Sequence, residues 1–237
     1  MLTYDNLSIA EATQIQKEMR QRIAIKPLQK AIKTIAGADI SFNKFSTTVH
    51  AGIVVFNYPE LTIKHIALAQ AEATFPYVSG FLAFREIPAL LKAWEMLPEK
   101  PDLLILDGQG ITHPRKMGIA THFGILEDQV TIGCAKSMLH GEFEELGLEK
   151  GSTCPIVKKD QLLGYALRTK NAVKPIYISP GNLITADESL AIVQNCVGKY
   201  RIPEPTRIAH ELVNLFRASQ LEEGLQDENN ELFTQFR

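Results

Sequence analysis

The chain has 237 residues, of which 45% are hydrophobic and 22% are charged, with a formal net charge of −2. This composition excludes a disordered or fibrous chain, and the charge gives no global basic signature, although a local basic patch could still bind nucleic acid. No apolar stretch approaches the roughly 20 residues needed to span a bilayer, and no signal-peptide core opens the chain. The three cysteines are too widely spaced for a disulfide framework or a CxxC zinc site. We therefore expect one cytoplasmic domain over residues 1–237, without a membrane partner.

The first half of the chain predicts a helix followed by a small sheet. Ser8 precedes Glu11 at capping-box spacing, and apolar residues then recur at helical intervals, which predicts a helix over residues 8–24. Three runs rich in apolar and β-branched residues follow and predict strands, at 34–42, 50–56 and 61–71. Short links between three successive strands indicate an antiparallel meander.

The second half alternates strands with helices. A loop at 75–80 leads into a helix with an apolar face, on which Glu86 lies at the edge and Pro88 is expected to cause a kink or an early boundary. Further elements are predicted as strands at 103–106 and 130–136, helices at 118–128, 186–197 and 205–216, a hairpin of 161–169 with 173–179, and a turn at 179–182. The acidic tail from about residue 218 is expected to be mobile. This order predicts an α/β fold with an RNase H-like core, in which helices flank a mixed central sheet.

The stretch 103–115 is the centre of the predicted site. Its apolar strand reads as buried on both faces and ends in Asp107, which a glycine-containing turn, His113 and Arg115 follow. A buried carboxylate is costly unless a cation or several donors meet it. Open α/β sheets bind their ligands at the carboxyl ends of strands, so Asp107 is predicted to hold a divalent metal.

Two other carboxylates occupy comparable positions. Asp39 lies on a predicted strand and Glu86 at a helix edge, and with Asp107 they would supply oxygen ligands suited to magnesium. The same residues could instead be cap or turn residues, and sugar kinase-like ATPases and phosphatases also place aspartates at strand ends. An ATPase would need a phosphate-cradling glycine loop near the first strand, and residues 39–42 supply none.

Four further residues each permit two interpretations. Lys136 ends an apolar strand and could be a surface lysine or a cation beside a phosphate. His113 could make a structural hydrogen bond or a catalytic contact. Tyr77 could be ordinary surface or, in a nucleic-acid enzyme, a wedge that replaces an extruded base. Periodicity places His210 on the polar side of its helix, which favours a surface position.

Five ordered blocks between about Gly37 and Arg217 resemble the endonuclease V (deoxyinosine 3′ endonuclease) family. The blocks are 37–41, 76–86, 107–110 with 113–115, 131–136 and 203–207. Two of them differ from the usual pattern. The wedge Tyr-Ile-Pro is Tyr77-Val78-Ser79 here, and Gln109 stands where Asp-Gly-His-Gly has histidine.

The resemblance implies an RNase H-like fold and nicking of DNA that contains deaminated bases, chiefly deoxyinosine, with Mg²⁺ or Mn²⁺ as cofactor. The implied cut lies on the 3′ side, one nucleotide beyond the lesion, and leaves a 3′-hydroxyl and a 5′-phosphate. An inosine-specific ribonuclease and a non-cleaving inosine-binding module are the alternatives. A monomer is the simplest expectation.

The resemblance also implies a role for each site residue by position. Asp39, Glu86 and Asp107 would bind the metal with support from His210, and Lys136 and His113 would act near the phosphate. Tyr77, flanked by Pro76 and Val78, would form the DNA wedge. The pocket for the flipped base would be formed by Gly80, Leu82, Gly108, Gly118, Ile119 and Gly133.

Overall fold

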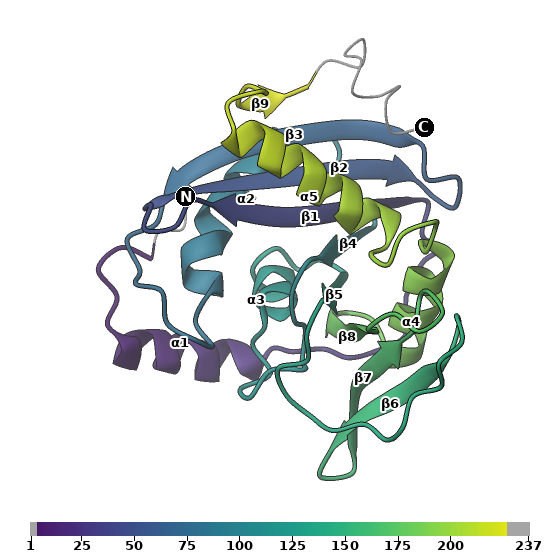
Figure 1. The fold of residues 1–237 in the computed structure, drawn as a ribbon. Coiled ribbons are helices and arrows are strands. Elements are labelled where there is room, and N and C mark those ends of the chain that lie inside the picture. The colour runs from purple at the N-terminus through teal and green to yellow at the C-terminus, as the bar shows by residue number, and fades with distance from the viewer. Residues whose placement is uncertain (1–3, 227–237) are drawn as a thin grey trace.

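The computed structural model describes residues 4–226, and a nine-stranded mixed sheet forms its centre, with helices on both faces (Figure 1). The strands are β1 (Thr34–Phe42), β2 (Thr48–Asn57), β3 (Ile63–Glu72), β4 (Leu103–Leu106), β5 (Thr131–Ala135), β6 (Thr153–Lys158), β7 (Gln161–Leu167), β8 (Ile176–Asn182) and β9 (Gly224–Leu225). The helices are α1 (Ile9–Arg20), α2 (Ala83–Met96), α3 (Ile119–Leu126), α4 (Ala186–Asn195) and α5 (Glu204–Arg217).

The strand order is β6-β7-β8-β5-β4-β1-β2-β3-β9. β1, β2 and β3 form the predicted antiparallel meander, while β4 and β5 lie parallel to β1 and follow helical crossovers. The predicted RNase H-like core is thereby confirmed. The decisive feature for function is the parallel pairing of β1 with β4, because it places Asp107, just beyond the carboxyl end of β4, beside Asp39 of β1.

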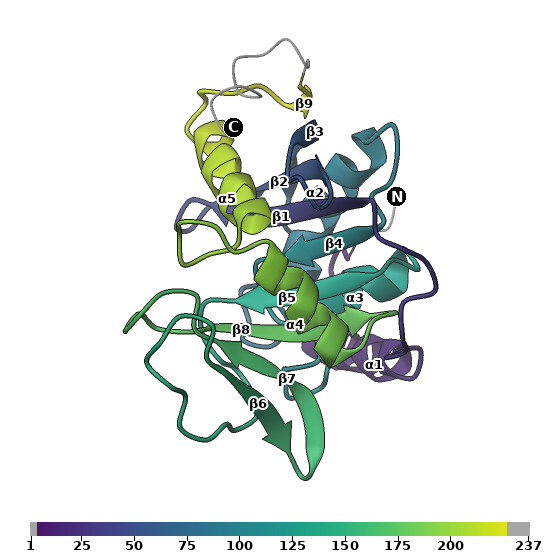
Figure 2. The same ribbon diagram turned by 90° about the vertical axis from the view of Figure 1, so that its right-hand side faces the viewer.

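Each face of the sheet carries its own layer of helices. Figure 2 shows α4 and α5 on one side of the sheet and α2 and α3 on the other. Phe84 and Trp94 of α2 pack with Phe123 of α3 in one core cluster, whereas Ile208 and Leu212 of α5 belong to the opposite cluster. Two covered faces explain why β4 is apolar at every position, as a buried parallel strand should be.

One local prediction was wrong, and another was wrong in one of its two alternatives. Residues 179–182 are not a turn but continue β8, which pairs with β5 through a register shift. Proline is tolerated here because it lies at the register shift, and glycine is needed because a Cβ on Gly181 would lie 2.3 Å from Thr131 Oγ1. Pro88 lies inside α2, which continues to Met96, so the early boundary is wrong, and the kink stays a prediction.

Strand β6 was not predicted at all. It pairs with β7 at the edge of the sheet and alternates exposed with buried residues, and Pro155 interrupts its apolar pattern. At the opposite edge, β9 pairs with β3, and the Gln226 amide donates to the Ile66 carbonyl (2.9 Å). These residues belong to the tail that the sequence predicts to be mobile, and residues 227–237 lie outside the described range. Among helices of residues 4–226, none has both the length and the apolar character required to cross a membrane.

Candidate active site

Two aspartates meet where β4 ends beside the parallel strand β1. Ala38 on β1 is paired with Leu106 on β4, so the next residue of each strand is an aspartate. The Asp107 amide donates to the Ala38 carbonyl (3.1 Å), which extends the ladder by one bond beyond β4. Asp39 is only 6% exposed, and a carboxylate in such a place needs a compensating partner.

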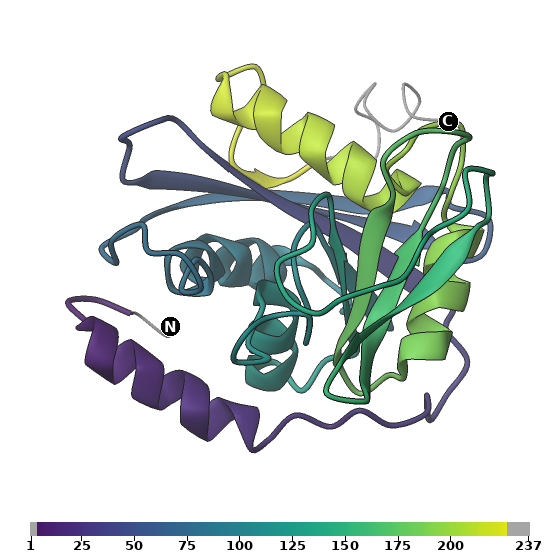
Figure 3. The same ribbon diagram turned by 60° about the horizontal axis from the view of Figure 1, so that its bottom comes forward.

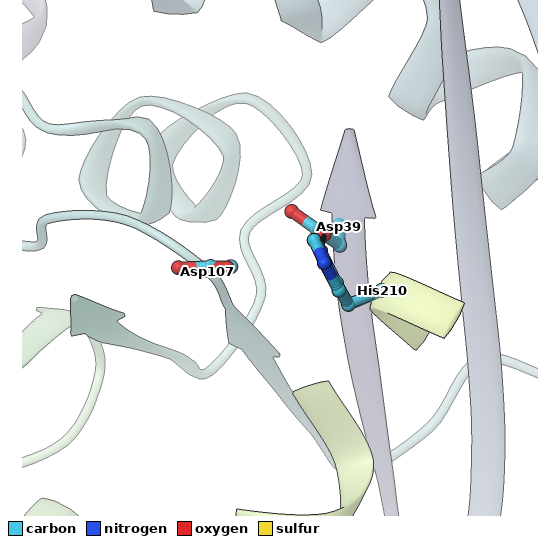
Figure 4. Close-up of side chains that lie close together, drawn as sticks. All are labelled: Asp39, Asp107 and His210. Atoms are coloured by element: carbon cyan, nitrogen blue, oxygen red, sulfur yellow. Dashed lines mark hydrogen bonds and ion pairs between the residues drawn. The ribbon is translucent and has the colours of Figure 1, made fainter. Parts of the chain in front are cut away.

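Helix α5 supplies that partner. A Cβ on Gly37 would lie 2.0 Å from the Pro205 carbonyl oxygen, so only glycine lets the first turn of α5 rest directly on β1. This close packing brings His210 Nδ1 to 2.5 Å from Asp39 Oδ2. One ligand atom from each of Asp39, Asp107 and His210 lies within 4.8 Å of the others, and Figure 4 shows the three side chains converging.

The electrostatics of this cluster favour a cation. Burial raises the pKa of Asp107, and the neighbouring charge of Asp39 raises it further. Burial, then Asp39 and Asp107, raise the pKa of Glu86 on α2 to about 8. Lys136, which directly follows β5, forms an ion pair with Asp107 and opposes this repulsion. Carboxylates that repel one another in this way are typical of a site that binds a positive ion.

A cavity of about 280 Å³ opens beside Asp107. Glycine backbone and apolar side chains form much of its wall, and Glu86 and His113 also reach it. Five of the six residues predicted for the base pocket line it, namely Gly80, Leu82, Gly108, Gly118 and Ile119. The cavity therefore offers main-chain polar groups between apolar surfaces, an arrangement that can hold a flat heterocycle.

His113 is buried, at 4% exposure, and its ring is oriented by the backbone. Its Nδ1 accepts from the amides of Arg115 (3.2 Å) and Met117 (3.4 Å), which leaves the proton on Nε2. Burial, with the charge of Arg115, lowers the pKa of His113 to about 4. The imidazole is therefore neutral near pH 7 and presents an N–H donor rather than a positive charge.

Comparison with known proteins decides the family. The family model of endonuclease V matches residues 17–211. The chain belongs to the endonuclease V family. An endonuclease V of Trichormus variabilis (strain ATCC 29413 / PCC 7937) is 42% identical over 209 residues, which are 88% of this chain and 95% of that protein. Endonucleases V hydrolyse phosphodiester bonds, so the chain is a nuclease, as the sequence predicts.

Solved structures of the family agree with this assignment. The endonuclease V of Bacillus subtilis superposes with a TM-score of 0.86 at 31% identity, covering 92% of this chain and 96% of that one. An endonuclease V of Ciona intestinalis superposes with a TM-score of 0.79 at 29% identity, covering 90% and 98%. That structure is a complex with a 23mer DNA containing an inosine followed by a ribo-adenosine.

The predicted wedge of this endonuclease V lies on the loop between β3 and α2. Tyr77 is 66% exposed, and Pro76 is exposed beside it, while Val78 is half-buried. The loop is held from both ends by the buried rings of Phe75 and Phe81. The tyrosine is thus an exposed ring on an anchored loop.

Gly133, the sixth predicted pocket residue, is outside the wall of the cavity. A Cβ on Gly133 would lie 2.2 Å from the Gly110 amide nitrogen, so this glycine lets the turn after Asp107 rest on β5. Gly133 therefore supports the turn that lines the cavity without lining the cavity itself. A motif comparison cannot distinguish these two roles.

Sequence reasoning missed part of the wall. Gln109, Met117 and the segment 137–139 also line the cavity. Gln109 Nε2 donates to the Ser137 carbonyl (2.8 Å), and Gln109 Oε1 accepts from Thr112 Oγ1 (2.6 Å), so the residue ties the two loops together. Its departure from the family pattern was the one available signal, because no periodicity places the loop after β5.

Proposed function

We propose that this chain nicks DNA on the 3′ side of deoxyinosine and other deaminated bases, one nucleotide beyond the lesion, leaving a 3′-hydroxyl and a 5′-phosphate. The observation that carries the proposal is the convergence of Asp39, Asp107 and His210 within 4.8 Å, next to a cavity of about 280 Å³. The inosine-containing DNA in the Ciona intestinalis complex supports the choice of substrate.

Magnesium is the proposed cofactor, with manganese as a substitute. The donors of Asp39 and Asp107 are hard oxygens. The raised pKa values of Asp107 and Glu86 reflect burial and the negative charge of neighbouring carboxylates, which a divalent cation would neutralise. When bound, the ion would activate the attacking water and offset negative charge on the phosphate. His210, oriented by Asp39, would support the site.

The remaining chemistry belongs to the side chains. As water attacks phosphorus in line, it gives up one proton, the bond to the 3′-oxygen breaks, and that oxygen takes up a proton in turn. Lys136 Nζ, which is ion-paired with Asp107, would exchange this contact for one with a non-bridging phosphate oxygen when the substrate binds. The neutral His113 would donate a hydrogen bond from its Nε2–H to the bound nucleotide.

Base recognition would use the wedge and the cavity. Tyr77 would fill the gap left by the flipped base, because it is an exposed ring at the end of an anchored loop. Backbone groups of Gly80, Gly108 and Gly118 would read the Watson–Crick edge of hypoxanthine, and Leu82 and Ile119 would pack on its faces.

The test is single-turnover nicking of a duplex that carries one inosine. Asp107→Ala should retain lesion binding and lose nicking in Mg²⁺. Asp102→Asn is the matched control, because Asp102 lies just before the opposite end of β4, where it is paired with Lys30 (2.7 Å), and it should nick normally. Nicking by Asp107→Ala at the wild-type rate would refute the metal role.

The same assay separates an enzyme from a binding module. A wild-type chain that binds inosine-containing DNA but leaves it intact with Mg²⁺ and with Mn²⁺ would be a non-cleaving binding module. Nicking that a chelator abolishes and excess Mg²⁺ restores is the result expected for the enzyme.

An RNA substrate is the second candidate. The DNA in the Ciona intestinalis complex has a ribo-adenosine after the inosine, so a 2′-hydroxyl is present at that position in a relative. Matched DNA and RNA strands, each with one inosine and with the cut position mapped, decide between the two substrates.

A further inference from the structure

We infer that Phe45, at the tip of the β1–β2 hairpin, is a second aromatic contact for the substrate strand and stacks on an unpaired nucleobase near the wedge. The inference rests on the proposed function and adds a contact outside the cavity and the cation site. A turn joins the two strands here, with the Ser46 amide donating to the Asn43 carbonyl (2.9 Å).

Neither burial nor turn geometry accounts for a phenylalanine at this position. Phe45 is 93% exposed, above Tyr77 at 66%. Its φ of +67° lies in the left-handed region, where a bulky side chain is disfavoured. The third position of a turn with positive φ suits glycine or asparagine. The phenylalanine strains its backbone and exposes apolar surface to water. Unfavourable local features of this kind are often found at functional sites.

The hairpin tip and the wedge loop are joined into one unit. Arg85, which is 9% exposed, donates to the Phe75 carbonyl of the wedge loop (2.8 Å) and to the Ser46 carbonyl of the hairpin (3.2 Å). The ring of Phe42, at the end of β1, lies 6.4 Å from the ring of Tyr77 between centroids. Both segments occupy the same side of the molecule in Figure 3. A strand held by Tyr77 would therefore pass close to Phe45.

The chemistry of the tip matches a nucleic-acid strand. Lys44 Nζ lies 4.9 Å from the centroid of the Phe45 ring, and the turn 43–46 contains no acidic residue. A cation beside an exposed aromatic ring is the combination by which proteins bind unpaired strands, with the cation on phosphate and the ring on a base. One ring and one cation are too small for a stable protein interface, which buries about 800 Å² on each partner.

The location also limits where the base lies. Phe45 lies six positions after Asp39, and at about 3.3 Å per position its backbone is within roughly 20 Å of that of the aspartate. That reach corresponds to a few nucleotides from the scissile phosphate. The stacked base is thus a neighbour of the lesion rather than the lesion itself.

The experiment uses the full chain and single strands that contain one inosine and one 2-aminopurine, placed in turn within six nucleotides on either side. Binding is measured in EDTA. Stacking on Phe45 should quench 2-aminopurine fluorescence at one position, and Phe45→Ala should abolish that quench. Affinity should fall about 5- to 150-fold, the range for one base–aromatic stack. Phe45→Trp should keep both signals.

Two controls separate stacking from misfolding. Phe45→Asn suits the left-handed turn, so its melting temperature should equal or exceed that of the wild type while its affinity falls as for alanine. Leu148→Ala removes another exposed apolar side chain, 69% exposed and outside the cavity lining and the wedge, and should leave binding unchanged.

The outcomes are distinguishable. If the alanine and asparagine variants bind with wild-type affinity and fluorescence, the inference is overturned and the proposed function stands. If Phe45→Ala changes the mass of the protein in solution without changing its affinity, the ring serves self-association and the inference is equally overturned. If the wild type neither binds nor nicks inosine-containing strands, the proposed function fails and this inference fails with it.

Discussion

Replacing Glu86 by glutamine should stabilise the metal-free protein near neutral pH while it removes nicking. Burial, Asp39 and Asp107 raise the pKa of Glu86 from 4.5 to about 8, and only Arg85 opposes them. Between these two values the folded chain holds a proton that the unfolded chain has released. The free energy of unfolding therefore falls as pH rises through this window.

The size of the effect follows from the two pKa values. Proton linkage gives a penalty of about 3 kcal/mol at pH 7 and about 1 kcal/mol at pH 5, relative to a carboxyl that never ionises. Glutamine has the shape of the protonated carboxyl and carries no such penalty. Glu86→Gln should therefore exceed the wild type in unfolding free energy by about these amounts.

The assay is urea unfolding in EDTA at pH 5 and pH 7, followed at pH 7 by a titration with Mg²⁺. Mg²⁺ should reduce the difference in unfolding free energy between the variant and the wild type. The ion stabilises the ionised Glu86 of the wild type and stabilises the uncharged glutamine of the variant less. A gap of the same size at both pH values, or a variant less stable than the wild type at pH 7, would contradict the electrostatic account of the site.

Three further changes test the scaffold. Gly37→Ala should lower the free energy of unfolding by about 1–3 kcal/mol, as overpacking does, because the added Cβ would lie 2.0 Å from the Pro205 carbonyl oxygen. It should also reduce nicking by displacing α5. A urea unfolding curve identical to that of the wild type would contradict this prediction. Burial lowers the pKa of His122 to about 3, so its contribution to stability falls by about 2 kcal/mol from pH 7 to pH 5 as the unfolded imidazole takes up a proton first. His122→Gln should lose that part of the pH dependence, and an unaltered unfolding profile would argue against it. Gln16 Nε2 donates to the Gly80 carbonyl (3.0 Å) in the pocket wall. Gln16→Leu should therefore raise KM about fivefold, which corresponds to the loss of one hydrogen bond, and leave kcat nearly unchanged. An unchanged KM in steady-state kinetics would show that Gln16 does not support the pocket wall.

Local features of the fold were predictable because neighbours in the chain determine them. The capping box of Ser8 and Glu11 forms as expected, although α1 ends at Arg20 rather than near residue 24. Strand β1 has the predicted bounds, and short links made the meander the natural pairing. Proline and glycine misled the prediction at 179–182, because there they meet the needs of neighbouring strands rather than of a turn.

The site was predictable only in part. Asp107 directly follows β4 and Asp39 lies on the adjacent parallel strand β1, so a strand-order argument can place them together. His210 could not be placed in this way, since periodicity puts it on the polar face of α5 and its side chain is indeed 51% exposed. It meets Asp39 across 171 residues because Gly37 lets α5 rest on β1.

By itself, the sequence determined the acidic residues, the strands that carry them and the glycines between them. The tertiary structure decided which of these groups share a space: the cavity beside Asp107, the support of its turn by Gly133, and the link from the wedge to the hairpin through Arg85. The reason is physical. Secondary structure follows from each residue and its near neighbours, whereas a site depends on close contacts between segments far apart in the chain, and only packing sets those distances.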